Sequence, residues 1–158
     1  MVSDAAQVPP SNLADMGRDY GANIMKRLAF ILTLLASNGA VAQDQKTIRA
    51  LNNLHDEMLA CIAYYTIGHA CTKDQLPPEI TESTAVAIKS LTEGSYEIGQ
   101  MLGMTDDAMT SRLRMHADEM RRLINESCIN FSSLLNRYAD RCQRVIQSPD
   151  SIFDEYMQ

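Results

Sequence analysis

Residues 45–72 have the sequence QKTIRALNNLHDEMLACIAYYTIGHACT, and their pattern decides the fold class. Apolar side chains recur there at steps of three and four residues, at Ile48, Leu51, Leu54, Met58, Ile62 and Tyr65. This spacing matches the 3.6 residues per turn of an α-helix, so these side chains share one helix face. The stretch is therefore predicted to form a long amphipathic helix that packs this face against other helices.

Two prolines separate this helix from the next one. The sequence KDQLPP at residues 73–78 ends in Pro77 and Pro78, which cannot lie inside a helix but can open its first turn. A second helix is predicted from about Glu79 to Leu102. Gly103 follows it and suits the left-handed backbone that often ends a helix.

A third helical segment begins at Thr105, whose hydroxyl can cap the first turn. Its apolar positions follow helical steps and include Leu123 and Leu135. A straight helix from Thr105 to Gln147 would measure about 64 Å. That is much longer than the two preceding helices, so we expect a bend within residues 125–130.

The remaining pattern completes an all-α prediction. Ser148 and Pro149 predict a short closing helix after the third segment. No stretch alternates apolar and polar residues as a β-strand does. With 158 residues, 46% of them apolar, the chain is long enough for one domain with a buried core. We expect a small bundle of three to four helices over residues 43–158, stabilised by disulfides.

A secretory leader is predicted before this domain. Lys26 and Arg27 precede the apolar run LAFILTLLA, and the small residues AVA come before a cut between Ala42 and Gln43. These are the three parts of a signal peptide, which would span residues 25–42. The alternatives are a transmembrane anchor or a buried core helix, but the apolar run has only about half of the roughly 20 residues that an anchor needs.

Residues 1–24 fit poorly in front of such a leader. They are acidic, whereas the start of a signal peptide is short and positive. Either Met25 is the true start of the protein or the leader carries an unusual extension. We favour Met25 as the start, which makes residues 1–24 a non-native or disordered extension.

The four cysteines, Cys61, Cys71, Cys128 and Cys142, all lie in the predicted mature domain. An even number of cysteines behind a signal peptide indicates disulfides, and buried free thiols are the alternative. In an up-down-up bundle, Cys71 and Cys128 lie at a similar height and are the favoured pair. Cys61 and Cys142 can pair only if the third segment folds back after its bend.

The sequence carries no recognisable catalytic or cofactor motif. It lacks C-x-x-C, H-x-x-x-H, E-x-x-H, G-x-S-x-G and P-loop patterns. His55 and His69 would lie about 21 Å apart along one helix, which is too far to share a metal ion. The adjacent acids Asp56 and Glu57 diverge by about 100° on a helix and predict a solvated face. We therefore expect no catalytic residue and no cofactor.

Methionine is the one unusual component, with ten residues in the chain. Thioether sulfur binds Cu(I), so a weak alternative is a copper site. Its ligands would come from a group within residues 101–120, namely Met104, Met109, Met115, His116 and Met120. The simpler interpretation is that the methionines fill the core and that His116 packs in the core or an interface.

The predicted function follows from the leader and from the missing motifs. A net charge of −6 without a clustered basic face argues against a nucleic-acid partner. We expect an exported protein, periplasmic or secreted, without a stable membrane anchor once the signal is cleaved. Its role would be non-catalytic, either structural or binding a partner that the sequence does not identify, with a protein as one candidate. The alternative is periplasmic copper binding.

Overall fold

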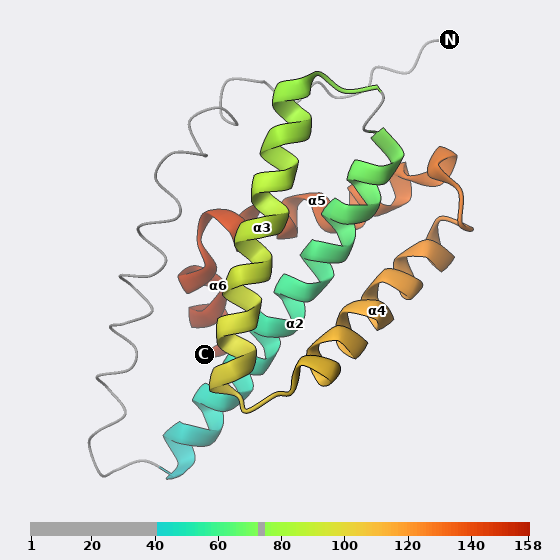
Figure 1. The fold of residues 1–158 in the computed structure, drawn as a ribbon. Coiled ribbons are helices and arrows are strands. Elements are labelled where there is room, and N and C mark those ends of the chain that lie inside the picture. The colour runs from blue at the N-terminus through green and yellow to red at the C-terminus, as the bar shows by residue number, and fades with distance from the viewer. Residues whose placement is uncertain (1–40, 73–74) are drawn as a thin grey trace.

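The computed structural model describes residues 41–72 and 75–158. Their helices are α2 (Val41–Thr72), α3 (Pro78–Met101), α4 (Asp106–Leu123), the 3-10 helix η3 (Cys128–Asn130), α5 (Ser132–Gln147) and α6 (Pro149–Tyr156). No strand occurs in these two ranges, which confirms the all-α prediction (Figure 1). The described part holds five α-helices instead of three to four, because a turn divides the third predicted segment into α4 and α5.

The predicted leader lies almost entirely outside the described residues. This holds for the expected extension at residues 1–24 and for the signal peptide as far as residue 40. Helix α2 begins at Val41, so only the predicted cleavage position between Ala42 and Gln43 falls within it, in its first turn.

The predicted helix ends are confirmed where local chemistry sets them. Pro78 is the first residue of α3, and Pro149 is the first residue of α6. Gly103 has a left-handed φ of 69° directly after α3. Thr105 caps α4 as expected, because its side-chain oxygen accepts a hydrogen bond of 3.3 Å from the backbone N–H of Ala108.

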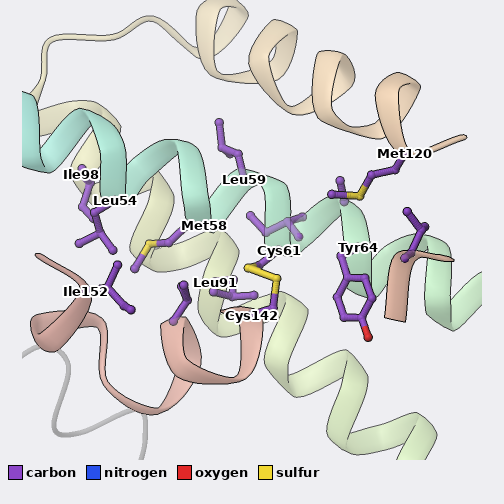
Figure 2. Packing of buried hydrophobic residues seen from close by; sticks show 14 of the residues in the cluster. Leu54, Met58, Leu59, Cys61, Tyr64, Leu91, Ile98, Met120, Cys142 and Ile152 are labelled. Carbon is purple, nitrogen blue, oxygen red and sulfur yellow. A yellow bond between two sulfur atoms is a disulfide. The ribbon is translucent and has the colours of Figure 1, made fainter. Parts of the chain in front are cut away.

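Helix α2 is the central element, because α3, α4, α5 and α6 all pack against it (Figure 1). Leu54, Met58 and Ile62 are buried, as the apolar period predicts. The core draws on every α-helix of the described part and includes Leu54, Met58, Leu59, Cys61, Tyr64, Leu91, Ile98, Met120, Cys142 and Ile152 (Figure 2).

Two positions of α2 differ from the predicted face. Ile48 is exposed, because the first turns of α2 extend past the other helices (Figure 1). Tyr64 is buried, whereas Tyr65 is only partly buried. The ring of Tyr64 stacks on Phe131 and Tyr138, with centroids 6.0 Å and 6.2 Å away. The side of α2 that carries Tyr64 is therefore covered by the segment that folds back after α4.

The expected bend is a sharp turn between α4 and α5. Asn125 and Glu126 both adopt a left-handed backbone, with φ of 49° and 55°. The turn shifts the helical phase, so the apolar period cannot be carried across it. Leu135, which the unbroken period places in the core, is exposed, and its neighbour Leu134 is buried instead. Leu123, which the same period places in the core, is also exposed although it precedes the turn, and the core takes its neighbour Ile124.

Two disulfides join the chain that follows this turn to α2. Cys71 pairs with Cys128, which confirms the favoured bridge. Cys61 pairs with Cys142, because α5 folds back along α2 as the second bridge requires. Cys61 and Cys142, the inner pair, are 1% and 0% exposed and lie within the core (Figure 2). In the outer pair, Cys71–Cys128, Cys71 is partly buried and Cys128 is exposed.

The difference in burial predicts the order of reduction. Under native conditions a dilute thiol should open Cys71–Cys128 first, because attack on a disulfide sulfur requires access to it. Cys61–Cys142 should open only when the core opens. Timed alkylation and peptide mass spectrometry measure both rates, and a denatured sample, in which the two rates should converge, is the control. Earlier reduction of the inner bridge in the native protein would contradict this prediction.

Two glycines allow α3 to approach the rest of the core. A β-carbon at Gly99 would collide with Met109 Sδ and would lie 3.3 Å from His55 Nε2. A β-carbon at Gly94 would lie 3.6 Å from Met58 Cε, which is an ordinary van der Waals distance. Only Gly99 therefore marks a place where α2, α3 and α4 meet too closely for a side chain.

Alanine at these two glycines should change stability in opposite directions. Gly99→Ala should lower the free energy of unfolding by about 1–3 kcal/mol, because overpacking forces neighbouring groups to move. Gly94→Ala, the matched control on the same helix, should raise it by up to about 1 kcal/mol through the better helix propensity of alanine. Urea unfolding followed by circular dichroism measures both changes. Equal effects of the two substitutions would argue against close packing at Gly99.

Candidate functional site

A groove of about 390 Å³ lies where α2, α4, α5 and α6 meet. Its lining comprises Asn53, Asp56, Glu57 and Ala60 from α2, His116 and Glu119 from α4, Arg137 and Tyr138 from α5, and Tyr156 from α6. Three carboxylates, an imidazole, a guanidinium and two phenols thus share one surface depression. Among these residues, sequence reasoning had named only His116 as a candidate for binding.

One wall of the groove is held by a hydrogen bond between α4 and α2. His116 Nε2 lies 3.0 Å from Asp56 Oδ1, and its imidazole is largely buried. The carboxylate accepts a hydrogen bond from the ring N–H, which fixes the orientation of the ring. The prediction that His116 lies in an interface therefore agrees with its position between these two helices.

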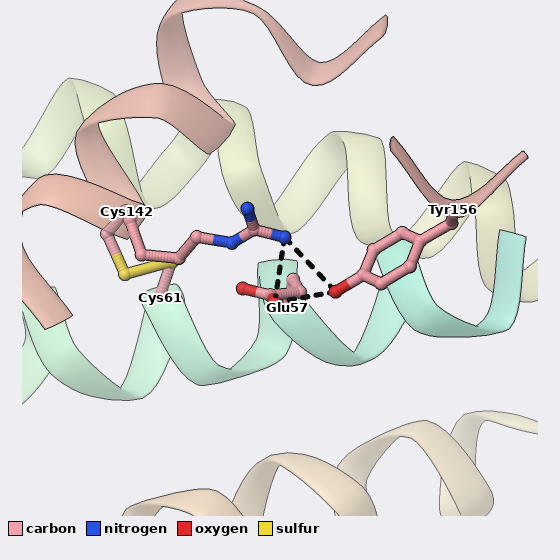
Figure 3. The surroundings of a disulfide bond; sticks show 5 residues. Glu57, Cys61, Cys142 and Tyr156 are labelled. Atoms are coloured by element: carbon pink, nitrogen blue, oxygen red, sulfur yellow. Dashed lines mark hydrogen bonds and ion pairs between the residues drawn. A yellow bond between two sulfur atoms is a disulfide. The ribbon is translucent and has the colours of Figure 1, made fainter. Parts of the chain in front are cut away.

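The opposite wall joins α2 to α5 and α6 through a three-membered network. Tyr156 donates its hydroxyl hydrogen to Glu57 Oε1 at 2.7 Å. Arg141 Nη2 lies 3.1 Å from the same Glu57 oxygen and donates to the Tyr156 hydroxyl at 3.1 Å. Figure 3 shows Glu57 and Tyr156 pointing toward each other beside the Cys61–Cys142 bridge. The inner disulfide and this polar network therefore fix the same part of the interface.

Glu155 extends the network along the surface. Arg141 Nη1 donates to Glu155 Oε2 at 2.8 Å, and Arg144 lies 3.0 Å from the other carboxylate oxygen. The hydrogen bond from Arg141 lowers the pKa of Glu155 below its ordinary value. The hydrogen bond to Glu57 raises the pKa of Arg141 further above its already high value. Both groups therefore stay charged over the whole physiological range.

The edge of the groove is less tightly held. Arg137 and Glu119 are exposed, and their charged atoms are 3.9 Å apart. The Arg137 guanidinium also lies over the ring of Tyr138, 5.5 Å from its centroid. An exposed ion pair at this distance contributes little, about 0–1 kcal/mol. Arg137 and Glu119 are therefore the groove charges that a bound partner could engage at the lowest cost.

The groove lining combines acidic, basic and hydrogen-bonding side chains. Its lining contains neither a serine or threonine hydroxyl nor a thiol. Residues 41–72 and 75–158 hold no group of three or more His, Cys, Asp or Glu side chains placed to bind a metal ion. The arrangement can recognise a polar surface by hydrogen bonds and opposite charges.

The structure distributes the predicted copper ligands along α4 and the turn before it. Met109 and Met120 are buried, but eleven residues on a helix correspond to about 16 Å. Met115 is 56% exposed, His116 pairs with Asp56, and Met104 lies in the turn ahead of α4. One ion could not contact Met109 and Met120 together. Copper binding stays a prediction that this geometry does not favour.

His55 is the most unusual polar residue of the structure. Its side chain is 0% exposed, and neither ring nitrogen has a hydrogen-bond partner among the described residues. Burial lowers the pKa of His55 below its ordinary value, and the nearby Arg112 guanidinium adds to this effect. A neutral imidazole is therefore enclosed where α2, α3 and α4 meet.

Sequence reasoning missed the roles of Asp56 and Glu57. Adjacent acids indicated a solvated face, yet Asp56 binds α4 and Glu57 binds α5 and α6. Their partners His116 and Tyr156 lie 60 and 99 residues away in the chain. The only local signal was the divergence of about 100° between neighbouring helix positions, which allows the two carboxylates to meet different helices.

Comparisons of the chain with models of known protein families, with curated proteins and with solved structures find no match. Within the described ranges, no helix combines the length and the apolar character needed to cross a bilayer.

Replacing Tyr156 by phenylalanine tests the network around the groove. Tyr156→Phe should lower the free energy of unfolding by about 1–2 kcal/mol, because Glu57 loses a charge-assisted hydrogen bond. Tyr96→Phe, at an exposed tyrosine on α3, is the matched control and should change stability little. Thermal and urea unfolding measure both variants. Equal stability of Tyr156→Phe and the unmodified protein would contradict a structural role for this hydroxyl.

The same variant has a pH signature. Burial, and after it the hydrogen bond to Glu57, raise the pKa of Tyr156 above its ordinary value of 10. Above pH 10 the unfolded tyrosine releases its proton more readily than the folded one, so the stability due to Tyr156 falls as pH rises. The difference in the free energy of unfolding between the unmodified protein and Tyr156→Phe should therefore become smaller above pH 10.

Proposed function

We propose that this chain is an exported helical protein that acts without catalysis and binds a partner in the groove between α2, α4, α5 and α6. The observation that carries the proposal is the pairing of all four cysteines in two disulfides. Such bridges form and persist in oxidising compartments, such as a periplasm or the extracellular space, and are rare in the cytosol.

The predicted leader supports the same compartment. Cleavage between Ala42 and Gln43 would remove only the first two residues of α2. Both α2 cysteines, the core face and the groove residues would remain in the mature protein. The signal peptide and the bridges are independent features, because one is a local sequence pattern and the other is a set of long-range contacts.

The fixed groove walls support a binding role. Asp56 is held by a hydrogen bond to α4 and Glu57 by an ion pair to α5, so a partner would meet oriented groups without ordering them first. Arg137 and Glu119 at the edge supply one charge of each sign. We infer a polar partner surface that carries both charges, as many proteins do, and not a nucleic acid.

Intact mass tests export and oxidation together. The full chain should be expressed in a secreting host, fractionated, and weighed with and without reduction and alkylation. We expect an exported species that begins at Gln43 and has four thiols that alkylate only after reduction. Ala42→Phe, which places a bulky side chain before the cut, should prevent cleavage. A full-length cytosolic species with free thiols would overturn the proposed location.

Crosslinking tests the groove separately. A photoreactive residue in place of Glu119 samples the groove, and one in place of Val86 samples an exposed position on α3. Crosslinks to an exported protein should form from position 119, and Arg137→Glu should weaken them by reversing the edge charge. Equal crosslinking from both positions, or no effect of the charge reversal, would contradict the groove as the binding surface.

A further inference from the structure

The enclosed imidazole of His55 is the polar group that the proposed function leaves unused. Its ring meets α3 at Gly99, since a β-carbon there would lie 3.3 Å from Nε2, and Met109 of α4 packs against the same glycine. Neither ring nitrogen has a hydrogen-bond partner among the described residues. A buried polar group without a partner destabilises the folded state, and a buried unpaired charge does so far more.

We propose that His55 is an acid-sensitive latch, whose protonation separates the first half of α4 from α2 while the rest of the bundle stays folded. The proposal does not depend on export or on the groove. It follows from which groups surround the ring and from how α4 is attached at its two ends.

The groups that act on His55 favour a neutral ring. Asp56 on α2 attracts the protonated form, whereas Arg112 and His116 on α4 oppose it, and α3 meets the ring at Gly99. Burial is the largest effect and lowers the pKa of His55 below its ordinary value of 6.5. Stability linked to this ring is thus complete above pH 6.5 and is lost as pH falls through 6.5 toward the lower folded value.

Helix α4 is the element that can separate locally from the rest of the bundle. It packs mainly on α2 (Figure 1). Residues with a left-handed backbone lie on both sides of it. Gly103 precedes it in open surroundings, where a β-carbon would meet nothing within 4 Å. Asn125 and Glu126 follow it. Because Gly103 can change its backbone angles without steric cost, the turn before α4 is a suitable hinge.

The second half of α4 is held more firmly. Met120 is buried in the core, and so is Ile124 directly after the helix. The chain then reaches Cys128, which the outer disulfide joins to the end of α2. His116 lies between the two halves, and its contact with Asp56 at 3.0 Å holds this part of α4 against α2. These contacts hold the second half of α4 in place, which confines the opening to the first half.

Hydrogen exchange of the full chain at about pH 7 and about pH 5 tests the latch, with exchange times corrected for the intrinsic effect of pH. In the unmodified protein, protection of residues 104–115 should fall about tenfold for each unit by which the pH drops below the ordinary pKa of histidine. Residues 132–147 of α5 should keep their protection. His55→Phe, whose ring cannot take a proton, should keep residues 104–115 protected at both pH values.

His69→Phe is the matched control, because it removes a partly exposed histidine near the far end of the same helix. In His69→Phe, residues 104–115 should lose protection at low pH as they do in the unmodified protein. Three results would overturn the proposal: protection of residues 104–115 that does not change with pH, an equal loss in all helices, or a pH response that persists in His55→Phe.

A second measurement covers the case in which His55→Phe does not fold. The ring proton resonances of His55 in the unmodified protein report its protonation directly. We expect the ring of the folded protein to titrate at the lower end of the pH range in which residues 104–115 lose protection, because burial lowers the pKa of His55 below 6.5. Titration of His55 outside that range would show that another group drives the opening and would overturn the latch.

Discussion

The contact of α2 with α3, α4, α5 and α6 is the constraint on which the rest of this structure depends. One helix supplies both the central apolar face and the first cysteine of each bridge. The Cys61–Cys142 bridge fixes where along α2 the returning helix α5 lies, and it does so inside the core. Without α5 in that position, Tyr64 would lose its stacking partners Phe131 and Tyr138.

Three consecutive residues of α2 lie in three different environments. His55 is enclosed near Gly99 and Met109, Asp56 pairs with His116 of α4, and Glu57 binds α5 and α6. Successive helix positions turn by about 100°, so neighbours in sequence face different helices. A neutral buried ring and two fixed carboxylates therefore lie within one turn of helix.

This arrangement separates two properties of the protein. The groove uses Asp56 and Glu57, whose partners hold them in place, and its exposed edge charges Arg137 and Glu119 supply the contacts for a partner. The latch uses His55 on another side of the same helix, with α4 as the moving element. His116 lines the groove and keeps its contact with Asp56, so opening of the first half of α4 leaves this wall of the groove in place.

The sequence by itself determined the features that depend on neighbouring residues. Pro78 and Pro149 open helices, Gly103 takes the left-handed backbone after α3, and Thr105 caps α4. Each effect comes from the residue's own side chain, or from its absence in glycine, and acts within one turn of helix. The helical period of α2 likewise placed Leu54, Met58 and Ile62 in the core. The geometry of an up-down-up bundle also favours the Cys71–Cys128 bridge, which the structure contains.

Only the tertiary structure decided what lies beyond the turn after α4. Asn125 and Glu126 both adopt a left-handed backbone, and neither is a glycine, the residue type that would predict it. They shift the helical phase, so that Leu134 is buried in the core in place of Leu135. The same turn brings Cys142 to Cys61, and the returning chain brings Tyr156 to Glu57. These contacts join residues that are far apart in the chain, so the local apolar period carries no information about them. The direction of the turn and the packing of whole helices decide which residues meet.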